Sequence, residues 1–518
     1  MKKVVIGIAS GSGLKHVFFL LAALIAGAAG RELEIVLVSM DKDRESPQHV
    51  QMEQTVKRFR KIIKKLPPGY QISIRYEYDD IMKDRLGEFT EDTTMEELLP
   101  KEDVKILKDL CTDEELKTKP ANGYYGKPAV GDLANHMTSR MDREWKIIEE
   151  IRSGLRRYDT IYIAIGSSFG GQGSNEVLNT VKQVAETFEK SRKEDTNGHR
   201  LFIYCIYILP YFTWEYREGH SIIAYVFWPN AAENLKSNWK KIWPDFQAME
   251  HGISVLDGLA LPGTVGLDEI TDEYSEAKGQ DRHFHVMDMA IANEVIHFIN
   301  QDLPKPGRGQ RPIYQEEWLM DGVEHVEWTT IFEGNSDTGR AFIRGFRFFV
   351  CVYILLKYLV KSDDMEREVI FDRIYGKELF KRSVRARNYL EQNREIMVTL
   401  RKIFGEMMEL AEDMLGALAD LCQSSRLGHT APVTELADAE RIIRILKEES
   451  ADLDTKLDEI ILVDEAYEKT SLTVRAVHNW ICDQIQIGRG RNETPEKTAA
   501  FLFGKVYEAV KQAETGTL

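Results

Sequence analysis

The sequence of 518 residues lacks the short motifs that mark several large enzyme classes. It has no GxxxxGK[ST] loop, whose lysine holds nucleotide phosphates, and no HExxH motif of zinc proteases. It also lacks an apolar run of the roughly 20 residues that a membrane-spanning helix needs. The apolar block from Phe348 to Leu356 is far shorter. These absences argue against a Walker-type ATPase, a zinc protease and a membrane span.

Cysteine is scarce, and acidic residues outnumber basic ones. The five cysteines form no CxxC pair and no Cys/His cluster with metal-ligand spacing: Cys111, Cys205, Cys351, Cys422 and Cys482. We therefore expect reduced thiols, mostly in the core, no metal site and a cytoplasmic location. The formal net charge of −16 argues against nucleic-acid binding through an overall basic field, so no nucleic-acid partner is predicted.

The N-terminal segment has the composition of an export signal but not its order. Lys2 and Lys3 precede an apolar segment, Val17 to Ala29, that ends in small residues. A strand-like run, VVIGIA, and a glycine turn intervene, and a second strand-like run, Leu33 to Ser39, follows. This order predicts a strand, a helix over about Lys15 to Ala29 and a second strand. The result is a βαβ unit with parallel strands.

The turn after the first predicted strand contains Gly11, Ser12 and Gly13, and Asp41 follows the second. In a dinucleotide-binding fold, such glycines approach the phosphates and the acid accepts hydrogen bonds from a ribose. The GxGxxG motif is incomplete, because His16 stands at its last position. For Asp41, a ribose contact and an exposed strand-end acid both remain open.

The stretch from Asp159 to Val177, DTIYIAIGSSFGGQGSNEV, organises the chain. It joins an apolar strand to an amphipathic helix through a turn with glycines at 166, 170, 171 and 173. Glycines let backbone N–H groups face a ligand, and the helix start adds unpaired N–H groups and a positive dipole end. The loop therefore suits an anion, above all a phosphate. A turn that only packs a helix on a sheet has the same composition.

Polar residues elsewhere are weaker candidates. Asn234 and Asn238 are four residues apart and share one face of a predicted helix. His285 and Asp288 lie one turn apart on another predicted helix, but a metal site needs three or four converging ligands. We therefore interpret that pair as polar side chains with hydrogen-bond partners inside the protein. The sequence identifies no catalytic residues.

The segment 302–312, rich in proline, glycine and charge, is the clearest linker. Before it, strands alternate with helices; after it, long amphipathic segments dominate, among them Gly376 to Cys422, Glu465 to Ile487 and Pro495 to Ala513. The sequence therefore predicts a Rossmann-like α/β nucleotide-binding domain with a parallel sheet over residues 1–301, followed by an α-helical domain over residues 313–518. The helical domain is expected to offer a bundle or a partner surface.

The order of these features resembles the nucleotide-binding domain of the tubulin and FtsZ superfamily. A glycine turn follows the first strand, an acid the second, and a Gly/Ala turn at Ala129 to Gly131 precedes a helix; GSSFGGQGSNEV then comes after the next strand. The superfamily signature is a loop of the type GGGTG[ST]G, and bacterial tubulin-like proteins carry a GSxFGGTGAS version. Gln172 stands where the family usually has threonine.

This resemblance implies a tubulin-like domain over about the first 300 residues that binds GTP or GDP, with Mg²⁺ as a further expectation. It implies that the phosphates are wrapped by Gly170, Gly171, Gln172, Gly173, Ser174 and Asn175, opposite Gly11, Ser12 and Gly13. Asp41 would approach the ribose or a metal-bound water, and Ala129 and Gly131 would sense the terminal phosphate. Asn234 or Asn238 would pair with the base.

Two functions follow as hypotheses. In the first, the chain is a guanine-nucleotide-binding protein that self-associates into an oligomer or filament under nucleotide control, with GTPase activity left uncertain. In the second, it is a sensor that binds a nucleotide, for example a cyclic oligonucleotide of prokaryotic defence, and signals to its helical domain without hydrolysis. Phosphate release from GTP separates the two. An NAD-dependent dehydrogenase is weakened by the incomplete GxGxxG.

Overall fold

The computed structural model describes the following residues, and every structural statement below concerns them: 1–9, 15–29, 32–40, 47–64, 71–79, 93–98, 113–117, 119, 145–167, 173–188, 199–208, 212–213, 256–263, 268–269, 284, 286–301, 313–319, 344–345, 347–353, 394–423, 461–463, 472–473, 480 and 495–514.

A seven-stranded sheet in the order β3-β2-β1-β4-β5-β7-β9 is the centre of the fold. All of its strand pairings are parallel. The strands are β1 (Lys2–Ala9), β2 (Glu32–Met40), β3 (Gln71–Asp79), β4 (Thr160–Ser167), β5 (Leu201–Ile208), β7 (Gly258–Gly263) and β9 (Ile313–Leu319). From β3 to β7 the order is that of the doubly wound Rossmann sheet, 3-2-1-4-5-6.

The central strands are apolar without alternation. Every residue of β4 and β5 is buried, and so is β1 from Lys3 onward. Parallel strands need such sequences because helices cover both of their faces. The predicted α/β class with a parallel sheet is confirmed.

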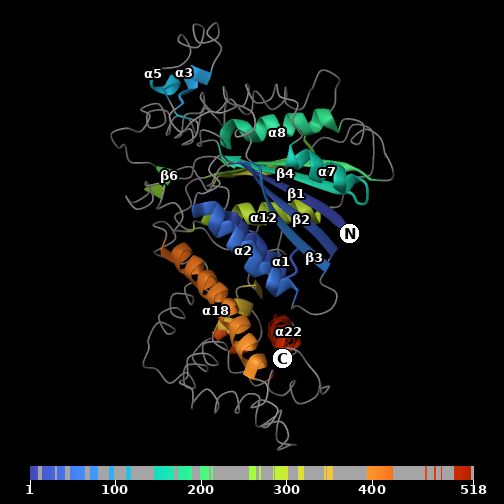
Figure 1. The fold of residues 1–518 in the computed structure, drawn as a ribbon, viewed down its shortest axis with the longest axis vertical. Helices are drawn as coiled ribbons and strands as arrows, with labels where there is room; N and C mark the ends of the chain where they lie inside the picture. The colour runs from blue at the N-terminus through green and yellow to red at the C-terminus, as the bar shows by residue number, and fades with distance from the viewer. Residues whose placement is uncertain are drawn as a thin grey trace, which may run out of the picture. The chain divides into compact units, whose positions relative to one another are not determined.

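Helices lie on both faces of the sheet (Figure 1). On one face are α7 (Lys146–Leu155) and α8 (Gly173–Thr187), whose apolar side chains share a core with alternate residues of the strands, such as Val38, Ala164 and Cys205. On the other face is α12 (Val286–Asn300), where Phe298 stacks on Tyr204 of β5 with ring centroids 4.5 Å apart. The two faces of each strand can therefore be assigned residue by residue.

The chain divides into two compact units, and the division runs through two helices. Unit 1 comprises residues 1–20, 32–56 and 71–324, and unit 2 comprises 21–31, 57–70 and 325–518. Both α1 (Lys15–Ile25) and α2 (Pro47–Ile63) therefore contribute residues to each unit. From Val17 to Ile25, α1 is buried on every side, which fits the uniformly apolar sequence of this range.

The C-terminal end of α1 is capped within unit 2. Gly27 adopts a φ of 81°, and the N–H of Ala28 donates to the carbonyl of Ala23 at 3.0 Å. This is the Schellman arrangement, which favours glycine at the left-handed position. The carbonyl of Ala26 accepts a hydrogen bond from Arg344 at 3.0 Å. The cap fixes where the chain leaves the helix.

Unit 2 contains helices and a short strand pair. Its long helices α18 (Arg394–Gln423) and α22 (Pro495–Glu514) pack together through Phe404 and Phe503, whose ring centroids are 6.1 Å apart. The expectation of continuous helix over Glu465 to Ile487 is wrong at Leu472 and Thr473. These residues form β11 (Leu472–Thr473), antiparallel to β10 (Ile461–Val463). The sheet also continues past the predicted linker, since β9 begins at Ile313, so a purely helical C-terminal domain is not confirmed.

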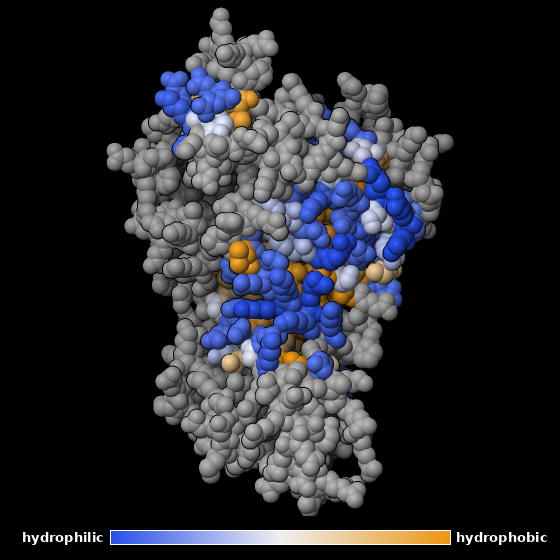
Figure 2. Space-filling model, in the orientation of Figure 1, coloured by the Kyte–Doolittle hydropathy of each residue, from blue (hydrophilic) through white to orange (hydrophobic). Residues whose placement is uncertain are grey.

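The remaining described elements are short: α3 (Met95–Leu98), α5 (Asp113–Leu116), and the two-residue strands β6 (Phe212–Thr213) and β8 (Asp268–Glu269), which pair in parallel. Cys205 and Cys351 are buried free thiols, as the sequence predicts. In the space-filling view, hydrophilic side chains predominate over the outward surfaces of α2 and α7 (Figure 2).

Among the helices that the structure describes, none combines the length and apolar character required to cross a bilayer.

Candidate functional site

The strand order creates a switch point between β1 and β4. From β1 the chain builds outward to β2 and β3, and from β4 it builds in the opposite direction to β5 and β7. Ligands of open α/β sheets bind outside the carboxyl ends of the strands at such a point. Here β1 ends at Ala9 and β4 ends at Ser167. The candidate site is therefore the carboxyl edge of the sheet at these two residues.

Both predicted glycine-rich loops connect to this edge. Residues 10–14 join β1 to α1, and residues 168–172 join β4 to α8. Two neighbouring parallel strands thus each lead into a glycine-rich loop and then a helix. The two glycine-rich segments that the tubulin resemblance assigned to opposite sides of the nucleotide phosphates therefore follow adjacent strands.

The structure places three predicted site residues and leaves the others outside the described part. Gly173, Ser174 and Asn175 form the first turn of α8, whose free backbone N–H groups favour an anion. Outside the described residues are Gly11, Ser12, Gly13, Asp41, Ala129, Gly131, Gly170, Gly171, Gln172, Asn234 and Asn238. For these residues the site stays a prediction from the sequence.

Three buried polar side chains at this edge have no hydrogen-bond partner within the described part of the chain. They are His16, through both ring nitrogens, and Ser39 and Ser167, through their hydroxyls. Each is at most 1% exposed. A buried polar group without a partner costs about 1–3 kcal/mol, so native structures normally satisfy it. A ligand that supplies polar atoms at this edge would remove that cost.

His16 is the second residue of α1, at the end of the helix nearest to β1. Its complete burial lowers its pKa from 6.5 to about 3, because the charged form loses its hydration. The imidazole is therefore neutral at pH 7, with one nitrogen as donor and the other as acceptor. It can hydrogen-bond to a ligand without adding charge.

Ser39 and Ser167 lie on the same face of the sheet. Ile8 of β1 is the register partner of both Ser39 and Ile165, and Ser167 follows Ile165 by two residues. Side chains two residues apart on a strand share a face. This face is opposite to that of Val38, which packs with α7 and α8. Both hydroxyls thus belong to the face that carries α12.

The α8 face of the same edge is closely packed. Glu176 is 1% exposed in the first turn of α8, and its carbonyl accepts a hydrogen bond of 2.6 Å from the Thr180 hydroxyl. The Tyr162 hydroxyl lies over Gly7, where an added Cβ would approach it to 2.9 Å. Burial raises the Tyr162 pKa well above 10, with Cys205 and Glu176 adding to the shift. On this face, the space between the strands and α8 is therefore filled by protein side chains.

Residues 166–170, GSSFG, also match the GxSxG pattern of serine hydrolases. In that fold the serine occupies a sharp turn directly between a strand and a helix. Here β4 ends at Ser167 and α8 begins only at Gly173, five residues after Ser168. The connection is therefore longer than the direct strand-to-helix turn of a nucleophile elbow.

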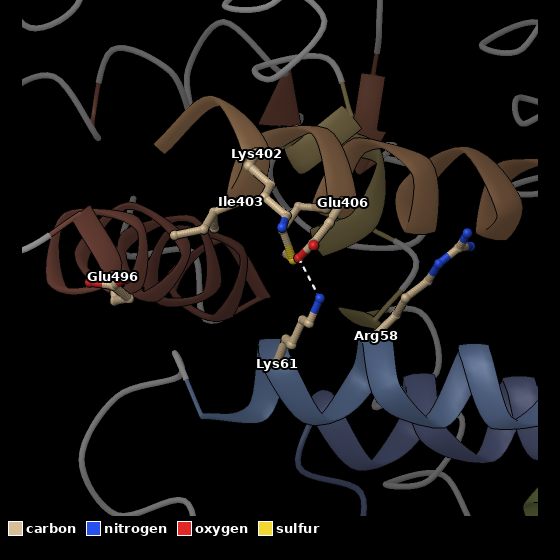
Figure 3. A pocket seen from close by; sticks show the side chains of 7 residues that line it. Arg58, Lys61, Lys402, Ile403, Glu406 and Glu496 are labelled. Carbon is tan, nitrogen blue, oxygen red and sulfur yellow. Dashed lines mark ion pairs between the residues drawn. The ribbon is translucent and has the colours of Figure 1, made fainter. Parts of the chain in front are cut away.

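Unit 2 contains a pocket of about 280 Å³ between α2, α18 and α22 (Figure 3). It is lined by Arg58, Lys61, Lys402, Ile403, Glu406, Met407 and Glu496. Two of its cations are already paired with acids of α18: Lys61 with Glu406 at 2.7 Å, and Arg58 with Glu409 at 3.3 Å. Its charges are thus largely neutralised, and it is the weaker candidate.

Comparison with known proteins finds no matching family model, no matching curated protein and no matching solved structure. The tubulin and FtsZ likeness accordingly rests on the sequence pattern. Among the described residues, no three His, Cys, Asp or Glu side chains are grouped to hold a metal ion.

Sequence reasoning did not select the unpartnered groups. His16 was noted only because it interrupts GxGxxG and Ser39 only as the end of a predicted strand, and Ser167 was not singled out within the stretch from Asp159 to Val177. The available signal was their position, since Ser39 and Ser167 are the last or nearly the last residues of their strands and His16 is the second residue of the helix that follows β1. Their burial follows from packing, which the sequence does not display.

Proposed function

We propose that the chain binds a phosphate-bearing nucleotide, in the first place a guanine nucleotide, at the carboxyl edge between β1 and β4. The observation that carries this proposal is the pair of glycine-rich loops, each followed by a helix, after adjacent parallel strands at the switch point. The free N–H groups of the α8 first turn, around Gly173, would hold phosphate oxygens. His16 and Ser167 would gain the hydrogen-bond partners that they lack.

Guanine-nucleotide-dependent self-assembly and hydrolysis are the extended form of this proposal, by analogy with the tubulin and FtsZ superfamily. Main-chain N–H groups and Mg²⁺ would stabilise phosphate charge, and a carboxylate would orient water. Candidates for this carboxylate among the described residues are Asp268 and Glu269 in β8 and the buried Asp288 in α12. Mg²⁺ would take its ligands mainly from phosphates and water.

The decisive variant is Gly171→Asp, which puts a carboxylate among the phosphate-binding N–H groups. We expect it to abolish binding of GTP and GDP in isothermal titration calorimetry. Gly416→Asp is the matched control, because an added side chain at this exposed position of α18 meets no atom within 4 Å. Unchanged GTP affinity in Gly171→Asp would refute the site.

A nucleotide sensor that does not hydrolyse its ligand is the second candidate function. It is favoured by the division of α1 and α2 between the two units, since each helix begins in unit 1 and ends in unit 2. Two assays separate the candidates: phosphate release from GTP, and light scattering with and without nucleotide. Release and assembly support the GTPase, whereas binding without either supports the sensor.

A further inference from the structure

The pocket of unit 2 has an apolar floor and a charged rim. Its floor is formed by Met407, which is 4% exposed, and by the half-buried Ile403. Its rim includes Lys61 and Lys402, whose side chains are exposed. All of its lining residues belong to unit 2. Pockets of this kind hold a ligand that buries an apolar part and is oriented by a few polar groups.

The size and the lining of this pocket favour a small aliphatic ligand. Its volume of about 280 Å³ lies just below the roughly 300–1,000 Å³ of pockets for drug-sized molecules. None of the residues that line it is aromatic, so a nucleobase would have no ring on which to stack. The flexible side chain of Met407 can adapt to the shape of an alkyl chain. The pocket therefore suits a different ligand class from the proposed nucleotide site.

Arg58 contributes its aliphatic stem to the pocket rather than a free charge. Its guanidinium points away from Lys61 (Figure 3). It pairs there with Glu409 at 3.3 Å and with Asp413, and neither acid lines the pocket. Arginine commonly packs its stem along apolar surface while its charged head stays near water. The positive charge of Arg58 is therefore already balanced and is not available to a ligand.

Lys402 leaves one positive charge unmatched at the rim. Lys402 and Glu406 lie one turn apart on α18, and both side chains point toward Lys61 of α2 (Figure 3). Glu406 pairs with Lys61 at 2.7 Å, whereas Lys402 forms no ion pair in the described part of the chain. The other lining acid, Glu496, lies in the first turn of α22, where the helix dipole favours it, and has a partner of its own. Two ammonium groups thus flank one carboxylate, and a second carboxylate would balance them.

We propose that this pocket binds a small amphipathic monoanion, an aliphatic chain that ends in one carboxylate, as in a medium-chain fatty acid. The chain lies against Ile403 and Met407, and the carboxylate lies at the ammonium group of Lys402. A phosphate monoester carries about two negative charges at pH 7, which is more than the one unmatched cation balances. The pocket shares no residue with the proposed nucleotide site, so neither proposal depends on the other.

Calorimetric titration of the full chain with octanoate tests this site, and octylamine is the probe of opposite charge. We expect octanoate to bind at least about tenfold more tightly than octylamine, because the unmatched charge is positive. Lys402→Met should weaken octanoate binding about tenfold through the loss of a charge-assisted hydrogen bond. Lys182→Met, at an exposed lysine of α8 outside the pocket, is the matched control and should leave octanoate binding unchanged.

The apolar part of the site is tested by chain length and by Ile403→Glu. Each methylene added between butanoate and octanoate should tighten binding about fourfold, because the pocket removes it from water. Ile403→Glu puts a carboxylate beside the alkyl chain and should abolish octanoate binding.

Three results would each refute the site: no octanoate binding, equal affinity for octanoate and octylamine, or an unchanged octanoate affinity in Lys402→Met. An affinity that does not depend on chain length would refute it as well. Lys402→Met alters an exposed side chain, so the test stays valid even if Ile403→Glu fails to fold.

Discussion

The two edges of the central sheet treat buried polar groups in opposite ways. Near the amino edge, Lys3 is 1% exposed and pairs with Glu150 at 2.7 Å and with Glu34 at 3.3 Å. Arg75 joins the same two acids, at 2.9 Å and 3.1 Å. At the carboxyl edge, the equally buried His16 and Ser167 have no partner in the described part of the chain.

This difference separates polar side chains that stabilise the fold from polar side chains that are candidates for contacting a ligand. If buried polar groups lacked partners at both edges, poor packing would be the simplest explanation. If they all had hydrogen-bond or ion-pair partners, the sheet would show no sign of a ligand site. Polar residues that the fold needs for itself are satisfied by the fold, as in the Lys3 network. His16, Ser39 and Ser167 lack partners at the edge where open α/β sheets bind ligands, although the hydroxyls of Tyr162 and Tyr204 inside the sheet lack a partner among the described residues as well. The variants below change either the paired groups near the amino edge or the unpartnered groups at the carboxyl edge.

The largest effect is expected from Lys3→Met, which removes the buried cation and leaves Glu34 and Glu150 to pair with the partly exposed Arg75. Breaking a buried ion pair at one partner is strongly destabilising, and we expect a loss of about 3 kcal/mol in the free energy of unfolding. Urea denaturation measures it. Adding Glu150→Leu to Lys3→Met should recover part of the loss, and a double variant as unstable as the sum of both singles would contradict the pairing.

The same network predicts acid sensitivity. Burial by itself would raise the pKa of Glu150, but hydrogen bonds and charges from Lys3 and Arg75 lower it below its ordinary 4.5. A carboxyl group whose pKa is lower in the folded state stabilises the protein above its unfolded pKa. That contribution is fully present at pH 7 and is lost as the pH falls below about 4.5.

His16 predicts a second, separate pH dependence. The pKa of His16 is about 3 in the folded protein and 6.5 ordinarily. Between pH 3 and pH 6.5 the unfolded chain therefore binds a proton at His16 that the folded chain does not. Stability should fall as the pH drops through this window, by about 2 kcal/mol between pH 6.5 and pH 5. His16→Phe should flatten the slope, measured by urea denaturation at several pH values.

Ser167→Ala should stabilise the ligand-free protein and lower its affinity for the nucleotide. Removing a buried hydroxyl that has no partner recovers about 1 kcal/mol of unfolding free energy, while the ligand loses a hydrogen bond. Thermal melting without nucleotide and calorimetry with GDP measure the two effects. A variant that is destabilised and binds GDP normally would show that Ser167 has a structural partner.

The sequence predicted the sheet well because its signals are local. The apolar runs of β1, β4 and β5 and the glycine turns after β1 and β4 are visible in a few adjacent residues. The pair β10 and β11 was missed because strands of two or three residues have no periodicity to detect. Within Glu465 to Ile487 the helical pattern was the stronger signal, and tertiary pairing overrode it at Leu472 and Thr473.

The candidate site was predicted in part, for a related reason. The glycine-rich segments after β1 and β4 predicted a phosphate site, and the strand order brings the ends of both strands to one switch point, while ligand binding itself stays a prediction. The unpartnered state of His16, Ser39 and Ser167 depends on side chains distant in sequence, so no short pattern reveals it. Histidine and serine are common on surfaces, and their complete burial here is a property of the packed sheet.

The smallest effect is expected from Lys146→Met, which breaks an ion pair on α7 without burial. Lys146 lies 3.6 Å from Glu77, and both side chains are 36% exposed. Water screens such a pair, so the free energy of unfolding should change by no more than about 0.5 kcal/mol. Lys146 donates its backbone N–H to Asp79, and the substitution preserves that bond. If Lys146→Met lowered the free energy of unfolding as much as Lys3→Met, an exposed ion pair would be as stabilising as the buried one. Burial would then not explain the large effect expected at Lys3.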